Sequence, residues 1–198
     1  MTTADKFTTV RLILAPVFFL FYHFDRFFFF GTTLFSLLGG VWIVIILWFL
    51  FILIEITDFL DGFAARKMGE VSDFGKLYDP FADTMTQLSF FLCFVIDGIF
   101  SPLLLLVVFY REFSILFLRN LYLRKGFTPA ARLSGKIKTV SYIIAIGFAL
   151  LASSIRLLFP DSSCFPLFSL IAGAVFLVSV IISVISFFDY VSVYRKIR

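Results

Sequence analysis

The stretch LLGGVWIVIILWFLFILIEITDFL, residues 37–60, is apolar except near its carboxyl end, where Glu55, Thr57 and Asp58 occur. An α-helix rises about 1.5 Å per residue, so a run of this length crosses a hydrocarbon core of about 30 Å. Backbone amides in lipid must be paired within the segment, and the run lacks the alternation of a barrel strand. The stretch therefore predicts a transmembrane helix.

The composition of the whole chain extends this prediction. Of its 198 residues, 61% are hydrophobic and 15% are charged, and the mean hydropathy is +1.06, which excludes an ordinary soluble domain. The sequence predicts an all-α integral membrane protein with six transmembrane helices in a single domain, residues 1–198. The six spans are Phe7–Phe24, Leu37–Leu60, Pro80–Phe100, Pro102–Tyr122, Thr139–Ser154 and Pro166–Tyr190.

The distribution of Lys and Arg predicts the orientation of these spans, because cytoplasmic loops carry an excess of both residues. The three outer loops of the six-span arrangement hold only two Lys or Arg residues, Arg26 and Arg156. Both termini and the segment after the second span are therefore expected to face the cytoplasm. The basic residues on that side are Lys6, Arg11, Arg66, Lys67, Lys76, Arg124, Lys125, Arg132, Lys136, Lys138, Arg195, Lys196 and Arg198.

Four aspartates gather where the second span ends and the third begins. Asp58 and Asp61 are three residues apart, and Asp79 and Asp83 are four apart, so each pair shares a helix face. If the two helices pack side by side, the four carboxylates converge and require a cation, since their mutual repulsion and desolvation are unfavourable. Oxygen ligands without His or Cys favour Mg²⁺, Mn²⁺ or Ca²⁺, and this many carboxylates can hold two ions.

Small residues follow the first aspartate pair. Gly62 and Ala65 leave room beside the carboxylates for close approach to the helix backbone, and Arg66 offers a planar fork that suits phosphate oxygens. Residues 69–73 are expected to form a short connector in which Ser72 or Asp73 can cap the next helix, and Pro80 is expected in the first turn of that helix.

The pattern Asp-x2-Asp-Gly-x2-Ala-Arg-x8-Gly-x3-Asp-x3-Asp, which ends at Gly75, Asp79 and Asp83, resembles the signature of the CDP-alcohol phosphotransferases. The resemblance implies metal-dependent transfer of a phosphatidyl group from CDP-diacylglycerol to an alcohol, with release of CMP. It also implies roles for individual residues. The metal ligands would be Asp58, Asp61, Asp79 and Asp83, of which Asp83 would also take the acceptor proton. The nucleotide and diphosphate contacts would be Gly62, Ala65, Arg66, Ser72, Gly75 and Thr8.

The fourth and fifth spans carry cations that bear on the acceptor alcohol. Arg111 lies deep in the fourth span, where an ionisable side chain faces the bundle interior or a wet cavity. With Arg119, Lys136 and Lys138 it predicts a site for an acceptor that itself carries phosphate. Two alternatives remain open: an internal ion pair of Arg111 with Glu112 or another acid, and a topological or headgroup-binding role for the two lysines.

The segments REFSILFLR (111–119), GKIKT (135–139) and TTVRLILAP (8–16) are similar to those of phosphatidylglycerophosphate synthases, whose acceptor is sn-glycerol 3-phosphate. Those enzymes usually have Pro and Asn where this chain has Ala4 and Asp5, while Thr8 and Arg11 match. The resemblance implies the membrane of a bacterial cell, with the active site on the cytoplasmic side.

Other functions compete with this one. Synthases that use inositol phosphate or serine share the aspartate motif, and a divalent-cation carrier also places carboxylates in a membrane. A carrier predicts acidic residues throughout the membrane depth, whereas here they cluster at one edge. The expected partners are CDP-diacylglycerol, glycerol 3-phosphate, membrane lipids and a second copy of the chain in a homodimer, with no nucleic acid.

Overall fold

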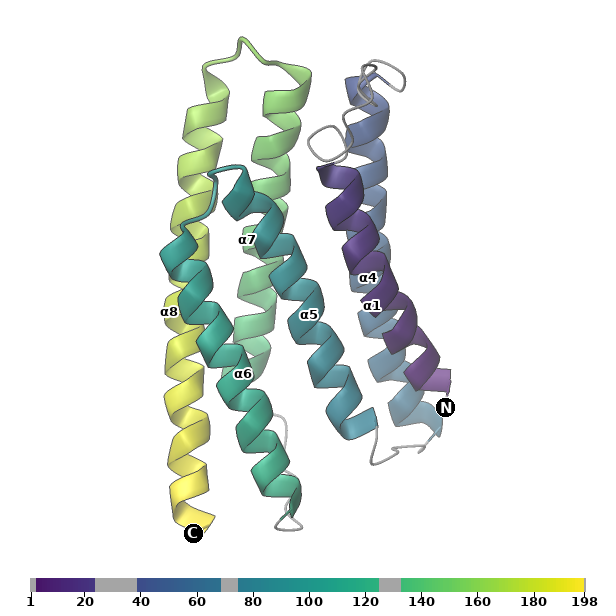
Figure 1. Cartoon of the computed structure of the whole chain (residues 1–198), viewed down its shortest axis with the longest axis vertical. Helices are drawn as coiled ribbons and strands as arrows, with labels where there is room; N and C mark the ends of the chain where they lie inside the picture. Colours follow the sequence, from purple (N-terminus) through teal and green to yellow (C-terminus); the bar gives the residue numbers. More distant parts are fainter. Residues whose placement is uncertain (1–2, 24–38, 69–74, 125–132, 198) are drawn as a thin grey trace. The chain divides into compact units, whose positions relative to one another are not determined.

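A computed structural model of the chain describes residues 3–23, 39–68, 75–124 and 133–197, and the side chains of 59–68, Lys76 and the ends of these ranges are outside the description. Helices account for nearly all of this described part (Figure 1). In chain order they are α1 (Thr3–Tyr22), α4 (Gly40–Met68), α5 (Gly75–Ile96), α6 (Pro102–Arg124), α7 (Leu133–Leu158) and α8 (Cys164–Ile197). The all-α fold is as predicted.

Each helix contains most or all of one predicted span, but the helix ends differ. α4 continues to Met68, so the backbone from Asp58 through Ala65 and Arg66 is helical. α5 begins at Gly75, which places Pro80 inside the helix and not in its first turn. The expectation for Pro80 was therefore wrong. Residues 75–79, which include Lys76 and Asp79, add more than a turn to the helix, and a criterion based on apolar runs leaves them out.

Three of the described helices are long and apolar enough to cross a membrane. These segments are Gly40–Asp58 of α4, Leu133–Leu158 of α7 and Cys164–Ser192 of α8. The other three described helices do not contain such a segment; α6, for example, carries Arg111, Glu112 and Arg119 along its length. The structure thus supports a membrane protein, while the count of six spans and the side on which the termini lie stay predictions.

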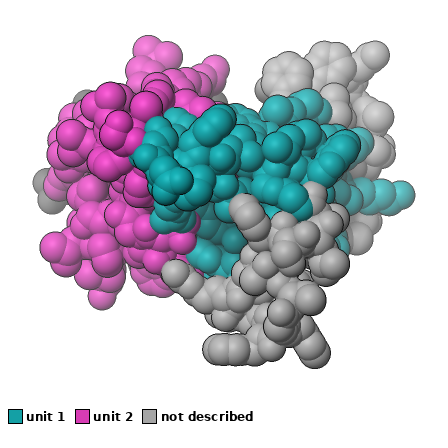
Figure 2. All heavy atoms as spheres, turned by 90° about the horizontal axis from the view of Figure 1, so that it is seen from above, with its two compact units in different colours: residues 1–93, 154–162 teal, residues 94–153, 163–198 magenta. Residues whose placement is uncertain are grey.

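The chain divides into two compact units, which are described one at a time (Figure 2). Unit 1 comprises residues 1–93 and 154–162, and unit 2 comprises residues 94–153 and 163–198. The expectation of a single membrane domain stays a prediction.

In unit 1, α1 packs along α4 (Figure 1). Aromatic rings fill the core between its helices: the ring of Phe90 in α5 lies edge-on to Phe18 of α1 at 4.7 Å and to Phe51 of α4 at 5.6 Å. Such edge-to-face pairs add to the stabilisation from burial alone. Trp48 also donates a hydrogen bond of 3.1 Å to Ser154 Oγ. These contacts fix the rotation of α1, α4 and α5 relative to one another.

In unit 2, α6 packs against α8, and Phe100 stacks on Phe176 of α8 with ring centroids 4.0 Å apart. The turn between α5 and α6 depends on Gly98, whose φ of 75° is in the left-handed region. That conformation lets the amides of Ile99 and Phe100 both donate to the carbonyl of Phe94, at 2.9 and 3.1 Å. The amide of Gly98 also donates to the carbonyl of Val95 at 3.0 Å, so two of the last carbonyls of α5 are paired.

Candidate functional site

Three carboxylates from two helices of unit 1 lie together. Asp58 is on α4, and Asp79 and Asp83 are on α5. One carboxylate oxygen from each lies within 4.8 Å of the others. The four-residue spacing places Asp79 and Asp83 on one face of α5, and the packing of α5 beside α4 brings Asp58 to them. We call these three residues the carboxylate cluster. The sequence predicted that four aspartates converge if the two helices pack side by side; the structure shows this for three of them, and the side chain of Asp61 lies outside the description.

A fourth charged residue completes the arrangement. Arg11 of α1 is buried, and its guanidinium pairs with an oxygen of each aspartate: Nη1 with Asp58, and Nη2 with Asp79 at 2.7 Å and Asp83 at 2.8 Å. Charge-assisted hydrogen bonds of this kind are the strong ones. Arg11 therefore ties α1 to α4 and α5 at the cluster.

The donor set fits a hard divalent cation. The described ligands are all carboxylate oxygens that lie within 4.8 Å of one another. Ca²⁺, which binds oxygen at about 2.3–2.6 Å, fits this spacing, and Mg²⁺, which binds oxygen at about 2.1 Å, requires the oxygens to approach one another slightly. Three carboxylates and one guanidinium leave two net negative charges, which a divalent cation neutralises. All three aspartate side chains are partly exposed, so an ion can reach them from solvent.

Further polar residues of α1, α4 and α5 lie near the carboxylate cluster. Thr9 Oγ1 and the Tyr78 hydroxyl share a hydrogen bond of 3.0 Å, which links α1 to α5 beside Arg11 and Asp79. Glu55, three residues before Asp58 on α4, is half-buried and interacts electrostatically with Asp83 and Arg11. Thr8 is buried on α1.

Several predicted site residues fall where the structure describes little. Asp61, Gly62, Ala65 and Arg66 belong to the helical backbone of α4, but their side chains lie outside the description. Ser72 lies outside the described residues altogether. Gly75 is the first residue of α5. Their assignments as metal or nucleotide ligands stay predictions.

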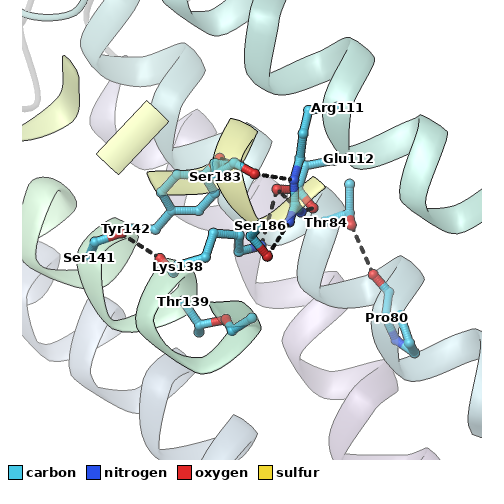
Figure 3. Close-up of polar contacts among 11 residues, drawn as sticks. Pro80, Thr84, Arg111, Glu112, Lys138, Thr139, Ser141, Tyr142, Ser183 and Ser186 are labelled. Atoms are coloured by element: carbon cyan, nitrogen blue, oxygen red, sulfur yellow. Dashed lines mark hydrogen bonds and ion pairs between the residues drawn. The ribbon is translucent and has the colours of Figure 1, made fainter. Parts of the chain in front are cut away.

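Unit 2 holds a second buried charged group (Figure 3). Arg111 and Glu112 are adjacent on α6, and Arg111 Nη1 lies 2.9 Å from both Glu112 oxygens. Lys138 of α7 donates to Oε1 of the same Glu112 at 3.1 Å. The ion pair between Arg111 and Glu112, which the sequence left open as an alternative, is therefore present. Two cations share one carboxylate, which leaves one net positive charge.

Helix α8 accepts three further hydrogen bonds from this group and from Tyr142. Arg111 Nε donates to the Ser183 carbonyl at 3.1 Å, and Nη2 donates to Ser186 Oγ at 3.2 Å (Figure 3). The Tyr142 hydroxyl donates a hydrogen bond of 2.7 Å to Ser183 Oγ. The centroid of its ring lies 4.7 Å from Lys138 Nζ, within the range of a cation–π contact. We call Arg111, Glu112, Lys138, Tyr142, Ser183 and Ser186 the polar network.

The other two predicted acceptor residues are less buried. Arg119 is half-buried on α6, eight residues after Arg111, and Lys136 is exposed on α7. The structure thus places Arg111 and Lys138 in one buried group, and Arg119 and Lys136 elsewhere on the same helices.

Sequence reasoning missed two parts of these sites. Arg11 was interpreted only as a topological charge and a motif match, although an arginine within the apolar run Val10–Pro16 was a signal of a buried partner. Glu112 was considered as a partner of Arg111 alone, and nothing in the sequence indicated that it also binds Lys138, because that contact joins residues 26 apart.

Known proteins match this chain over most of its length. The family model described as CDP-alcohol phosphatidyltransferase matches residues 1–185. The CDP-diacylglycerol--glycerol-3-phosphate 3-phosphatidyltransferase of Treponema pallidum is 36% identical over 198 residues, which cover 100% of this chain and 91% of that protein. The protein of the same name from Bacillus subtilis is 37% identical over 102 residues, 52% of this chain and 53% of its own. The probable phosphatidylglycerophosphate synthase of Mycobacterium tuberculosis is 30% identical over 151 residues, 76% of this chain and 66% of its own. Because the family match includes the whole carboxylate cluster and extends nearly to the carboxyl end, the chain belongs to the CDP-alcohol phosphatidyltransferase family.

Proposed function

We propose that this protein transfers a phosphatidyl group from CDP-diacylglycerol to sn-glycerol 3-phosphate, which yields phosphatidylglycerophosphate and CMP. The observation that carries the proposal is the carboxylate cluster, which the family motif supplies and which α4 and α5 bring together. The full-length relative from Treponema pallidum, which is named for this reaction, supports the same substrates.

The residues of unit 1 would act on the donor substrate. Asp58, Asp61, Asp79 and Asp83 would hold one or two ions, Mg²⁺ or Mn²⁺, and a bound ion supplies neutralisation of the charge that develops on the diphosphate. Gly62, Ala65, Arg66, Ser72, Gly75 and Thr8 would contact the nucleotide and its diphosphate.

The transfer itself makes one bond and breaks another. The acceptor hydroxyl oxygen forms a bond to the phosphorus of the phosphatidyl group, and the bond from that phosphorus to the bridging oxygen breaks, so that CMP leaves with this oxygen. Asp83 takes the hydroxyl proton. A carboxylate that is 40% exposed, as Asp83 is, can pass this proton on to water.

The residues of unit 2 would bind the acceptor. Its polar network has one net positive charge in a buried setting, which suits an acceptor that carries a phosphate group. Arg111 and Lys138 would contact this phosphate, and Arg119 and Lys136 would add charge along its path. To contact the phosphate, Arg111 would have to replace part of its contacts with Glu112 by contacts with the phosphate oxygens.

We further propose that all six helices cross the membrane of a bacterial cell, with both termini and the carboxylate cluster on the cytoplasmic side and with two copies forming a homodimer. The three helices that are long and apolar enough to span a membrane, and the basic residues predicted for the cytoplasmic side, support this topology.

Purified protein in detergent tests the reaction. Labelled CDP-diacylglycerol, Mg²⁺ and a panel of acceptors are supplied, and CMP release is measured. Release should depend on glycerol 3-phosphate, and both a chelator and Asp83→Asn should abolish it. Release with inositol phosphate or serine but not with glycerol 3-phosphate would reassign the acceptor. Release that ignores every acceptor would refute the synthase activity.

A further inference from the structure

Arg11 is buried far more completely than the carboxylates that it binds. Its side chain is 2% exposed, whereas those of Asp58, Asp79 and Asp83 are 39%, 46% and 40% exposed. The guanidinium thus approaches the aspartates from the protein side, and solvent reaches them from the other.

The contacts of Arg11 occupy one oxygen of each aspartate. Its Nη1 and Nη2 atoms are bound to Oδ1 of Asp58, Asp79 and Asp83. A guanidinium cannot lose its proton in a protein, so it can release these oxygens only by moving. An ion that binds the same three Oδ1 atoms must therefore compete with Arg11.

The guanidinium is also incompletely satisfied where it lies. Within the described part of the chain, Arg11 Nε is buried and has no hydrogen-bond partner. Buried donors in proteins are nearly always paired, so this one calls for an explanation. In its observed position the guanidinium contacts all three carboxylates through Nη1 and Nη2, while Nε has no partner among the described residues. Electrostatic attraction to the carboxylate cluster therefore holds the side chain there.

We propose that Arg11 is the internal counter-cation of the carboxylate cluster: it holds the three aspartates together when no metal is bound and gives up these contacts when a divalent cation binds them. This inference rests on the metal site of the proposed function. It adds that the affinity for the ion is set by competition with Arg11, which keeps the cluster ordered but opposes the incoming charge.

The proposal predicts the sign of two effects for Arg11→Met. Without metal, the three carboxylates repel one another with no counter-charge, so the variant should unfold at a lower temperature than the wild type. With metal, the variant lacks the positive charge of Arg11, which in the wild type repels the bound cation. One charge at about 6 Å from a divalent ion in water-exposed surroundings changes the affinity about tenfold, so Mn²⁺ should bind the variant about tenfold more tightly.

Mn²⁺ titration of the detergent-purified protein, followed by the loss of the electron paramagnetic resonance signal of free Mn²⁺, measures this affinity. Thermal unfolding is measured in parallel in EDTA and in saturating Mn²⁺, where Mn²⁺ should raise the melting temperature of Arg11→Met by more than that of the wild type. Lys6→Met is the matched control, because it removes a charge of the same sign from an exposed position on α1. It should change the affinity for Mn²⁺ much less.

Arg11→Lys covers the case in which Arg11→Met does not fold. An ammonium keeps the charge but lacks the fork that spans three carboxylates, so Mn²⁺ should bind this variant about two- to threefold more tightly than the wild type, between the wild type and Arg11→Met. Affinity that is equal or weaker in every Arg11 variant that folds would overturn the proposal, while Mn²⁺ binding by the wild type would leave the metal site intact. A wild type that binds no Mn²⁺ would overturn the metal chemistry of the proposed function and this inference with it.

Discussion

Replacing Glu112 by glutamine removes the one carboxylate that two buried cations share. In the wild type, Arg111 Nη1 contacts both Glu112 oxygens at 2.9 Å, and Lys138 Nζ contacts one of them at 3.1 Å. Glutamine offers one uncharged acceptor oxygen, and its NH₂ group, itself a donor, would replace the second carboxylate oxygen that Nη1 contacts. We therefore expect Glu112→Gln to destabilise unit 2 strongly.

The size of this effect follows from the two cations that the substitution leaves buried without a counter-charge. Breaking a buried ion pair by removing one partner costs about 3–5 kcal/mol, because the other charge stays buried. The glutamine oxygen retains one hydrogen bond, which favours the lower end, about 3 kcal/mol. For a protein of this length, about 2–4 °C of melting temperature corresponds to each kcal/mol, so the expected decrease is about 6–12 °C.

Thermal unfolding in detergent, followed by far-ultraviolet circular dichroism, measures the decrease. Asp161→Asn is the control, since it removes the same charge from an exposed position and should leave the melting temperature within about 1 °C. Lys138→Met provides a second test. The double variant Glu112→Gln/Lys138→Met should lose less melting temperature than the sum of the two single variants, because it no longer buries the Lys138 ammonium without a counter-charge. A Glu112→Gln variant as stable as the wild type, or strict additivity, would refute this account of the polar network.

Three further changes test separate contacts. Arg111→Ala should raise the KM for glycerol 3-phosphate about 30-fold, from the loss of a charged hydrogen bond of about 2 kcal/mol, with the KM for CDP-diacylglycerol little changed; an unaltered acceptor KM would leave Arg111 a purely structural role. Tyr142→Phe loses its 2.7 Å bond to Ser183 Oγ and should lower the free energy of unfolding by about 1 kcal/mol, measured by thermal unfolding. Gly98→Ala meets no atom within 4 Å of the added Cβ, so its expected cost of about 1–2 kcal/mol arises from the φ of 75° alone, whereas Gly147→Ala within α7, equally free of contacts, should be neutral or stabilising. Equal melting temperatures for the two glycine variants would contradict the backbone argument.

The helices and the carboxylate cluster could be predicted because both depend on short-range patterns. Apolar runs long enough to span a membrane must be helical, and residues three or four apart on a helix must share a face. Asp79 and Asp83 therefore had to lie together, and only the packing of α4 beside α5 had to be assumed for Asp58. The ends of α5 were less predictable, since the polar residues before Pro80 contribute nothing to an apolar run.

The partners of Arg11 and Lys138 could not be predicted, because each depends on how one helix is rotated about its axis relative to another. Helix α4 exposes large apolar side chains such as Val41, Ile45 and Phe49, and α8 exposes Leu167, Leu170 and Ile181. Helices that are apolar on all sides give no sequence signal for the face that turns inward. Ring contacts such as Phe18 with Phe90 settle that rotation, and they become known only from the folded chain.

The two charged groups are built on the same electrostatic principle. Each contains a residue of opposite sign, Arg11 in the carboxylate cluster and Glu112 in the polar network, because uncompensated charge is unfavourable away from water. In neither group is the compensation complete: the cluster keeps two negative charges and the network keeps one positive charge. If each group were fully neutralised, the protein would be more stable without its ligands, but no net charge would attract them. If neither group were neutralised at all, the like charges would repel one another and the side chains would move apart. The residual charge of each group is opposite to that of its proposed ligand, a divalent cation in one and a phosphate in the other, so the incomplete pairing is itself what makes binding favourable.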